Sequence, residues 1–114
     1  MARISALEFA EQVHTACADS ESVMRFETLS ASTVHIQLRI FLVDRSFLDV
    51  YYDQANGKTS FAQIHNEKRI FGADNAPKIW HWHPLENPES HQLVDHEITF
   101  AEFLEQVETH LSRQ

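Results

Sequence analysis

The sequence predicts an α+β fold, with an antiparallel meander sheet of about five strands and N- and C-terminal helices packed on one face. Three observations support this prediction. Apolar residues recur at helical spacing near both ends of the chain, and they alternate with polar residues in the middle. The links between the alternating segments are too short for parallel crossovers. Because the chain has 114 residues, of which 43% are hydrophobic, we expect residues 1–114 to form a single domain.

The first helix is predicted from residue 4 to about residue 18. Its apolar residues recur every three or four positions and form one stripe, which contains Ala6, Phe9, Ala10, Val13, Ala16 and Cys17. The polar segment 19–22 then favours a turn. A strand is predicted over residues 23–29, although its alternation is imperfect.

The clearest strand is predicted over residues 33–43, where one face carries Val34, Ile36, Leu38, Ile40 and Leu42. Asn56 and Gly57 tolerate positive φ and therefore predict a hairpin turn. Further extended segments are expected at 47–53, 58–65, 69–73 and 79–83. Near the end, Thr99 and Glu102 form a capping box before a second helix, whose apolar residues again lie at helical spacing.

Composition limits the classes of function. The net charge of −8 argues against a general attraction to nucleic acid or to an anionic membrane, while leaving room for a local basic patch. The apolar runs are far shorter than the roughly 20 residues of a membrane-spanning helix, and we expect no membrane association. The start of the chain lacks the apolar stretch of a secretory signal, and the single cysteine excludes an internal disulfide. We therefore expect a cytoplasmic protein.

Candidate functional side chains are concentrated between residues 71 and 96, which contain four of the eight histidines and both tryptophans. In an extended segment, His81 and His83 project to the same face, and Trp80 and Trp82 project to the other. If the following loop folds back, His91 can join them, and the sequence predicts His81, His83 and His91 as ligands of a divalent metal. His96, with Asp74 or Asp95, could approach the same point.

The same residues suit a metal-free reaction on RNA. His81 and His83 can act as base and acid in phosphodiester cleavage, with Asp74 as the third catalytic candidate. Predicted substrate contacts are Arg69 and Lys78 to the phosphate, and Trp80 or Trp82 stacked on a base. Structural roles explain the same residues, because a histidine often bonds a backbone carbonyl and tryptophans often fill a core.

One family shares this pattern. The sequence DNAP at residues 74–77, the histidines that follow, and the terminal segment ITFAEFLEQVE resemble a diverged member of the TumE-like toxin family of bacterial toxin–antitoxin pairs. The resemblance covers Leu38 to the C-terminus. It implies a toxin that acts on RNA or translation, with an antitoxin as partner, and it places His81 and His83 in the family's histidine cluster. If catalytic, such a chain is a ribonuclease-like hydrolase.

Two further classes of function fit the sequence. The chain could be a non-catalytic module that binds a metal or a partner protein through the tryptophan- and histidine-containing segment. It could also be a homodimeric structural domain in which a second copy covers an edge strand. The placement of His81, His83 and the two tryptophans distinguishes these alternatives.

Overall fold

A computed structural model describes residues 3–111 and shows two helices and seven strands within that range. The helices are α1 (Ala6–Ala18) and α2 (Phe100–Leu111). The strands are β1 (Val23–Ala31), β2 (His35–Leu42), β3 (Phe47–Asp53), β4 (Thr59–His65), β5 (Lys68–Asp74), β6 (His81–His83) and β7 (Gln92–Leu93). The α+β class is confirmed, but the predicted number of about five strands is wrong. The three-residue strand β6 lies within the segment 79–83 that was predicted to be extended, whereas β7 has only two residues and is too short to produce a period in the sequence.

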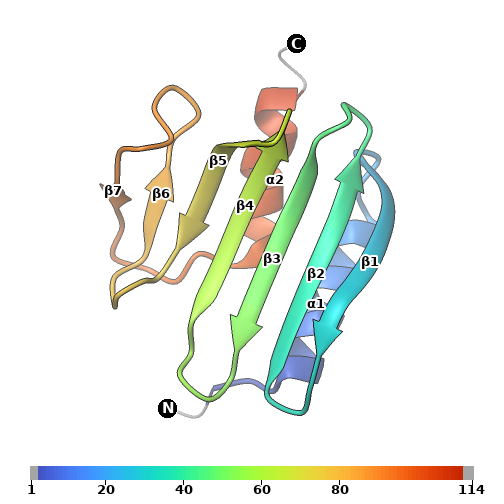
Figure 1. Cartoon of the computed structure of the whole chain (residues 1–114), viewed down its shortest axis with the longest axis vertical. Helices are drawn as coiled ribbons and strands as arrows, with labels where there is room; N and C mark the ends of the chain where they lie inside the picture. Colours follow the sequence, from blue (N-terminus) through green and yellow to red (C-terminus); the bar gives the residue numbers. More distant parts are fainter. Residues whose placement is uncertain (1–2, 112–114) are drawn as a thin grey trace.

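The sheet is a continuous antiparallel meander in the order β1-β2-β3-β4-β5-β6-β7. Figure 1 shows both helices behind the sheet, so the prediction that they share one face is confirmed. The opposite face carries no helix within the described residues. We call it the open face. Neither described helix is long and apolar enough to cross a membrane.

Local signals account for the ends of the helices. Ser5 caps α1, because its hydroxyl oxygen accepts a hydrogen bond from the backbone N–H of Glu8 at 3.0 Å. Thr99 caps α2 in the same way, accepting from the backbone N–H of Glu102 at 3.1 Å, as the capping box predicted. The hairpin turn between β3 and β4 is also as predicted, with Gly57 at a φ of 76°.

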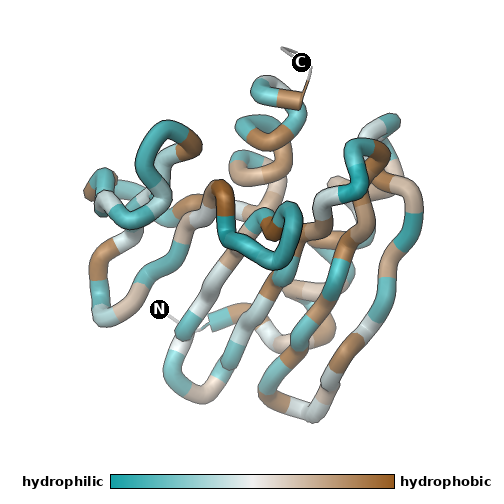
Figure 2. The backbone as a smooth tube through the Cα atoms, turned by 45° about the horizontal axis from the view of Figure 1, so that its top comes forward, coloured by the Kyte–Doolittle hydropathy of each residue, from teal (hydrophilic) through white to brown (hydrophobic). Residues whose placement is uncertain are grey.

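Alternation along the strands separates the two faces of the sheet, and Figure 2 shows hydrophobic and hydrophilic residues alternating along its strands. In β2 the helix-covered face buries Ile36, Leu38, Ile40 and Leu42. Val34 was predicted on this face but lies before the strand and is 43% exposed.

An aromatic cluster joins α2 to the centre of the sheet. The ring centroid of Phe103 on α2 lies 5.2 Å from that of Phe61 on β4 and 5.3 Å from that of Phe71 on β5. Trp82 on β6 packs against the same cluster, with its ring 5.5 Å from Phe71. This packing anchors the short strand β6 and determines which of its side chains face the helices.

Candidate functional site

The pairing of β5 with β6 brings the predicted site residues together. Asp74 lies opposite His81, Ala73 opposite Trp82, and Gly72 opposite His83. Because Trp82 packs against the helix side and side chains alternate along a strand, His81 and His83 project to the open face. Asp74 lies on that face as well, because it is next to Ala73, which is buried in the core.

Both β6 histidines are buried and held by backbone carbonyls. Each has a relative exposure of only 5%. The Nδ1 of His81 lies 3.1 Å from the carbonyl oxygen of Ile79, and the Nδ1 of His83 lies 3.1 Å from that of Pro88. These contacts leave the Nε2 atoms of both rings directed elsewhere, toward the same partner.

That partner is the Asp74 carboxylate. One of its oxygens lies 3.3 Å from the Nε2 of His81, and the other lies 2.9 Å from the Nε2 of His83. Asp74 also accepts a hydrogen bond from the backbone N–H of Ala76 at 3.0 Å, which is the contact of an Asx turn at the start of the DNAP sequence. The carboxylate is therefore fixed between two imidazole rings by a local backbone contact.

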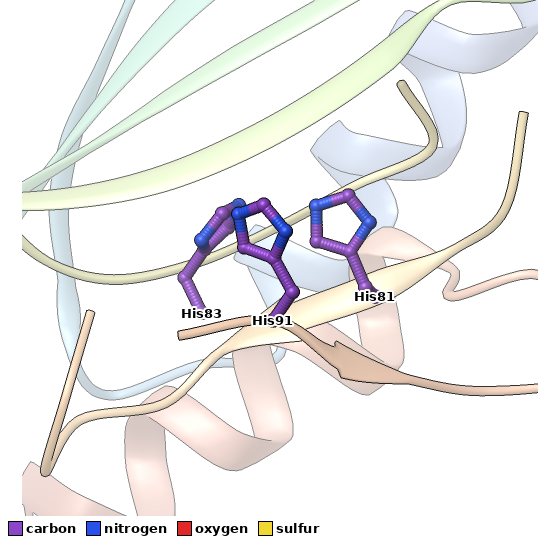
Figure 3. A group of neighbouring side chains, drawn as sticks. All are labelled: His81, His83 and His91. Atoms are coloured by element: carbon purple, nitrogen blue, oxygen red, sulfur yellow. The ribbon is translucent and has the colours of Figure 1, made fainter. Parts of the chain in front are cut away.

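His91 completes the group from the segment that leads into β7. Its ring centroid lies 4.7 Å from that of His81 and 4.9 Å from that of His83, and the residue itself is exposed. Figure 3 shows the three rings gathered beside β6. One ring nitrogen from each lies within 4.8 Å of the others. We call Asp74, His81, His83 and His91 the histidine cluster.

His96 does not join this cluster. Its Nε2 contacts the carboxylate of Glu102 in the first turn of α2 at 3.1 Å, and its Nδ1 lies 3.6 Å from Asp95. The hydrogen bond to Glu102 is the main cause that raises the pKa of His96 above its ordinary value. His96 is thus held at the start of α2. His91 is the histidine from this part of the chain that reaches β6.

A comparison with known protein families matches residues 6–111 to the family described as Toxin TumE. The chain belongs to the TumE toxin family. The match extends beyond the resemblance in the sequence, which began at Leu38, and includes α1. Curated proteins and solved structures give no match to this toxin.

Arg69, one of the predicted substrate contacts of this TumE toxin, lies beside the cluster. Its Nη2 donates to the carbonyl oxygen of Pro88 at 3.1 Å, the same oxygen that His83 approaches. Gly72 lies close to the neighbouring strand, because a Cβ there would lie only 3.0 Å from the backbone oxygen of Phe61. The Pro88 carbonyl, which the sequence did not reveal, therefore ties the loop after β6 to both side chains.

Lys78, the other predicted phosphate contact, lies in the exposed connection between β5 and β6. It lines a cleft of about 430 Å³ with Lys58 of the neighbouring hairpin. The remaining lining residues are Asn56, Asn75, Ala76 and Pro77. This cleft directly follows Asp74 along the chain and brings a second lysine that the sequence analysis did not single out.

The tryptophans lie on the other side of the sheet. Both rings pack against the core, Trp82 on Phe71 and Phe103, and Trp80 on Phe61 with 6.0 Å between ring centroids. Their predicted alternation with the histidines is thus observed, but the sheet separates them from the histidine cluster. Neither ring can stack on a base bound there, because both serve the helix-facing packing.

Proposed function

We propose that this TumE toxin cleaves RNA at the histidine cluster. The observation that supports the proposal is the convergence of three imidazoles and one carboxylate on the open face, with Arg69 beside them. Histidines that bond only to carbonyls would serve structure alone. Here His81 and His83 also meet a common acidic partner and an exposed third ring, which is the arrangement of a reactive centre.

RNA carries its own nucleophile in the 2′-hydroxyl group. Cleavage requires a base for the proton of that hydroxyl, an acid for the leaving oxygen, and positive charge close to the phosphate. Imidazoles perform such proton transfers near neutral pH. In this proposal His81 and His83 are the catalytic pair, and Asp74 orients both rings. The phosphate approaches from the side of the exposed His91 and contacts that ring.

Local charge supports RNA binding despite the net charge of −8. Arg69 lies on one side of the cluster, and the cleft containing Lys58 and Lys78 follows Asp74 on the other. Cations on both sides of the cluster can hold a phosphate backbone where the overall field of the protein does not. We propose that a short single-stranded segment lies between these cations.

The toxin family also suggests a partner. We propose that an antitoxin protein neutralises this toxin in the cell and that the two are produced together. The tryptophan-mediated protein contact receives less support, because both indole rings pack against the core.

Expression in a bacterial host tests the proposed function. Induction of the native chain should arrest growth and fragment cellular RNA. His91→Ala should permit growth, because it removes one ring of the histidine cluster. The side chain of His91 is exposed, so its loss leaves the core intact. His65→Ala is the matched control, since His65 ends β4 and pairs with Lys68, whereas Asp74 pairs with Ser60 at the other end of the same strand pair. Growth arrest with intact RNA, or equal toxicity of His91→Ala and the native chain, would contradict the proposal.

A further inference from the structure

We infer that the histidine cluster binds one divalent transition-metal ion, of the class that includes Zn²⁺. The ligands are the Nε2 atoms of His81 and His83, one ring nitrogen of His91, and a carboxylate oxygen of Asp74. This inference goes beyond the proposed function and does not depend on RNA being the substrate. It follows from the hydrogen bonds of the two buried rings.

Backbone carbonyls determine where the ring protons lie. A carbonyl oxygen only accepts hydrogen bonds, so the contacts to Ile79 and Pro88 require a proton on the Nδ1 of His81 and on the Nδ1 of His83. A neutral imidazole carries a single N–H. The Nε2 atom of each neutral ring therefore presents a lone pair.

Both lone pairs point at an acceptor. One oxygen of the Asp74 carboxylate lies 3.3 Å from the Nε2 of His81, and the other lies 2.9 Å from the Nε2 of His83. Acceptors facing acceptors repel one another unless positive charge lies between them. One divalent cation accepts both lone pairs and balances the carboxylate at once.

The distances fit this interpretation. Zinc bonds to imidazole nitrogen and carboxylate oxygen are close to 2.1 Å, so neighbouring ligand atoms of a tetrahedral site lie roughly 3.4 Å apart. The Nε2 of His81 lies 3.3 Å from one Asp74 oxygen and the Nε2 of His83 lies 2.9 Å from the other, so each nitrogen has a carboxylate oxygen at about the spacing of neighbouring ligands. The three histidine nitrogens lie within 4.8 Å of one another. Binding of the ion would require the exposed His91 side chain to move closer to the other two rings.

The ligand set and its surroundings select the class of metal. Imidazole nitrogens suit zinc, copper, iron and nickel, whereas magnesium and calcium prefer oxygen ligands. Metal-binding histidines usually donate their other N–H to a carbonyl or carboxylate, which fixes the orientation of the ring. The Ile79 and Pro88 carbonyls provide that support here, and Arg69 holds the Pro88 carbonyl in turn.

A bound ion would also supply what the acidic chain lacks, namely a concentrated positive charge on the open face. Because His91 is the exposed ligand, solvent and phosphate oxygens reach the ion from that side. With the ion bound, the imidazole nitrogens would be ligands, so the proton transfers proposed above for His81 and His83 belong to the metal-free chain. An ion with these four protein ligands would polarise a phosphate oxygen by adding it as a fifth ligand.

Cobalt binding tests the inference without any RNA. The full chain, purified without a histidine tag and dialysed against a chelator, is titrated with Co²⁺ and followed by visible absorption, and Zn²⁺ retained after gel filtration is measured by elemental analysis. We expect one ion per chain and the strong absorption of four-coordinate cobalt. His91→Ala and the nearly isosteric Asp74→Asn should each weaken binding by at least about tenfold. His65→Ala should bind like the native chain.

The outcomes separate the two proposals. If the dialysed chain takes up neither ion, or if His91→Ala and Asp74→Asn bind as tightly as the native chain, the metal inference is overturned. Circular dichroism of both variants is recorded to check that they are folded, so that a loss of binding can be assigned to the ligands. Stoichiometric metal in a chain that leaves RNA intact would support the inference and refute the proposed function. RNA cleavage by a chain that binds no metal would do the reverse.

Discussion

Truncation of Phe103 to alanine should remove a large part of the stability that holds β6 in place. Phe103 is 0% exposed, and its ring centroid lies 5.2 Å from Phe61, 5.3 Å from Phe71 and 6.3 Å from Trp82. A buried Phe→Ala substitution costs about 3–5 kcal/mol. The aromatic pairs, each worth about 0.5–1.5 kcal/mol beyond burial, place the expected loss in the upper half of that range, at about 4–5 kcal/mol.

Urea unfolding measures this loss. The free energy of unfolding of a domain is about 5–15 kcal/mol. The variant should therefore fold with a much smaller free energy of unfolding. Tryptophan fluorescence reports on Trp82 beside the substitution, and far-ultraviolet circular dichroism reports on the whole chain. Leu7→Ala, at a residue that is 69% exposed, is the control and should change stability by no more than about 0.5 kcal/mol. A loss below about 2 kcal/mol for Phe103→Ala would refute the packing described here.

Three further predictions follow from single contacts. The hydrogen bond to Glu102 raises the pKa of His96, and protonated His96 therefore stabilises the folded chain. This stabilisation is fully present below the unfolded-state pKa of about 6.5 and is lost as pH rises through the folded-state pKa. His96→Gln should therefore destabilise the chain more at about pH 5.5 than at about pH 8.5 in urea unfolding, and an equal effect at both would contradict this. Burial, with Glu108 nearby, raises the pKa of Cys17 to about 11, so the thiol should react with a disulfide reagent far more slowly in the native chain than in urea. Gly57 has a φ of 76°, and Gly57→Ala should cost roughly 1–2 kcal/mol in thermal unfolding, whereas an unchanged midpoint would show that the turn tolerates a side chain.

The sequence predicts elements whose pattern is long enough to show a period. The alternation around Leu38 and Ile40 fixes β2 and its buried face, and the Asn56–Gly57 pair fixes the hairpin that follows β3. β7 could not be found in this way. Its two residues pair with β6 only because the loop after β6 folds back, and such tertiary contacts leave no local signal.

In the candidate site, too, some placements follow from local sequence and others depend on tertiary contacts. The spacing of His81 and His83 was enough to place them on one face, opposite Trp82. The approach of Asp74 depends on the register of β5 against β6, and that of His91 depends on a loop whose path the sequence does not specify. The tryptophans were assigned to substrate because exposure cannot be read from alternation, whereas the aromatic residues of β4, β5 and α2 draw them into the core.

The most direct test of the proposed function is cleavage of a short single-stranded RNA by the purified chain, with the matching DNA oligonucleotide as a control that lacks the 2′-hydroxyl group. The proposal predicts that the native chain and His65→Ala cleave the RNA and not the DNA, and that His91→Ala is slower by at least about tenfold, the lower end of what one acid–base or ligand group contributes. If the native chain leaves the RNA intact, or if His91→Ala cleaves it at the native rate, the histidine cluster is not the place of this reaction.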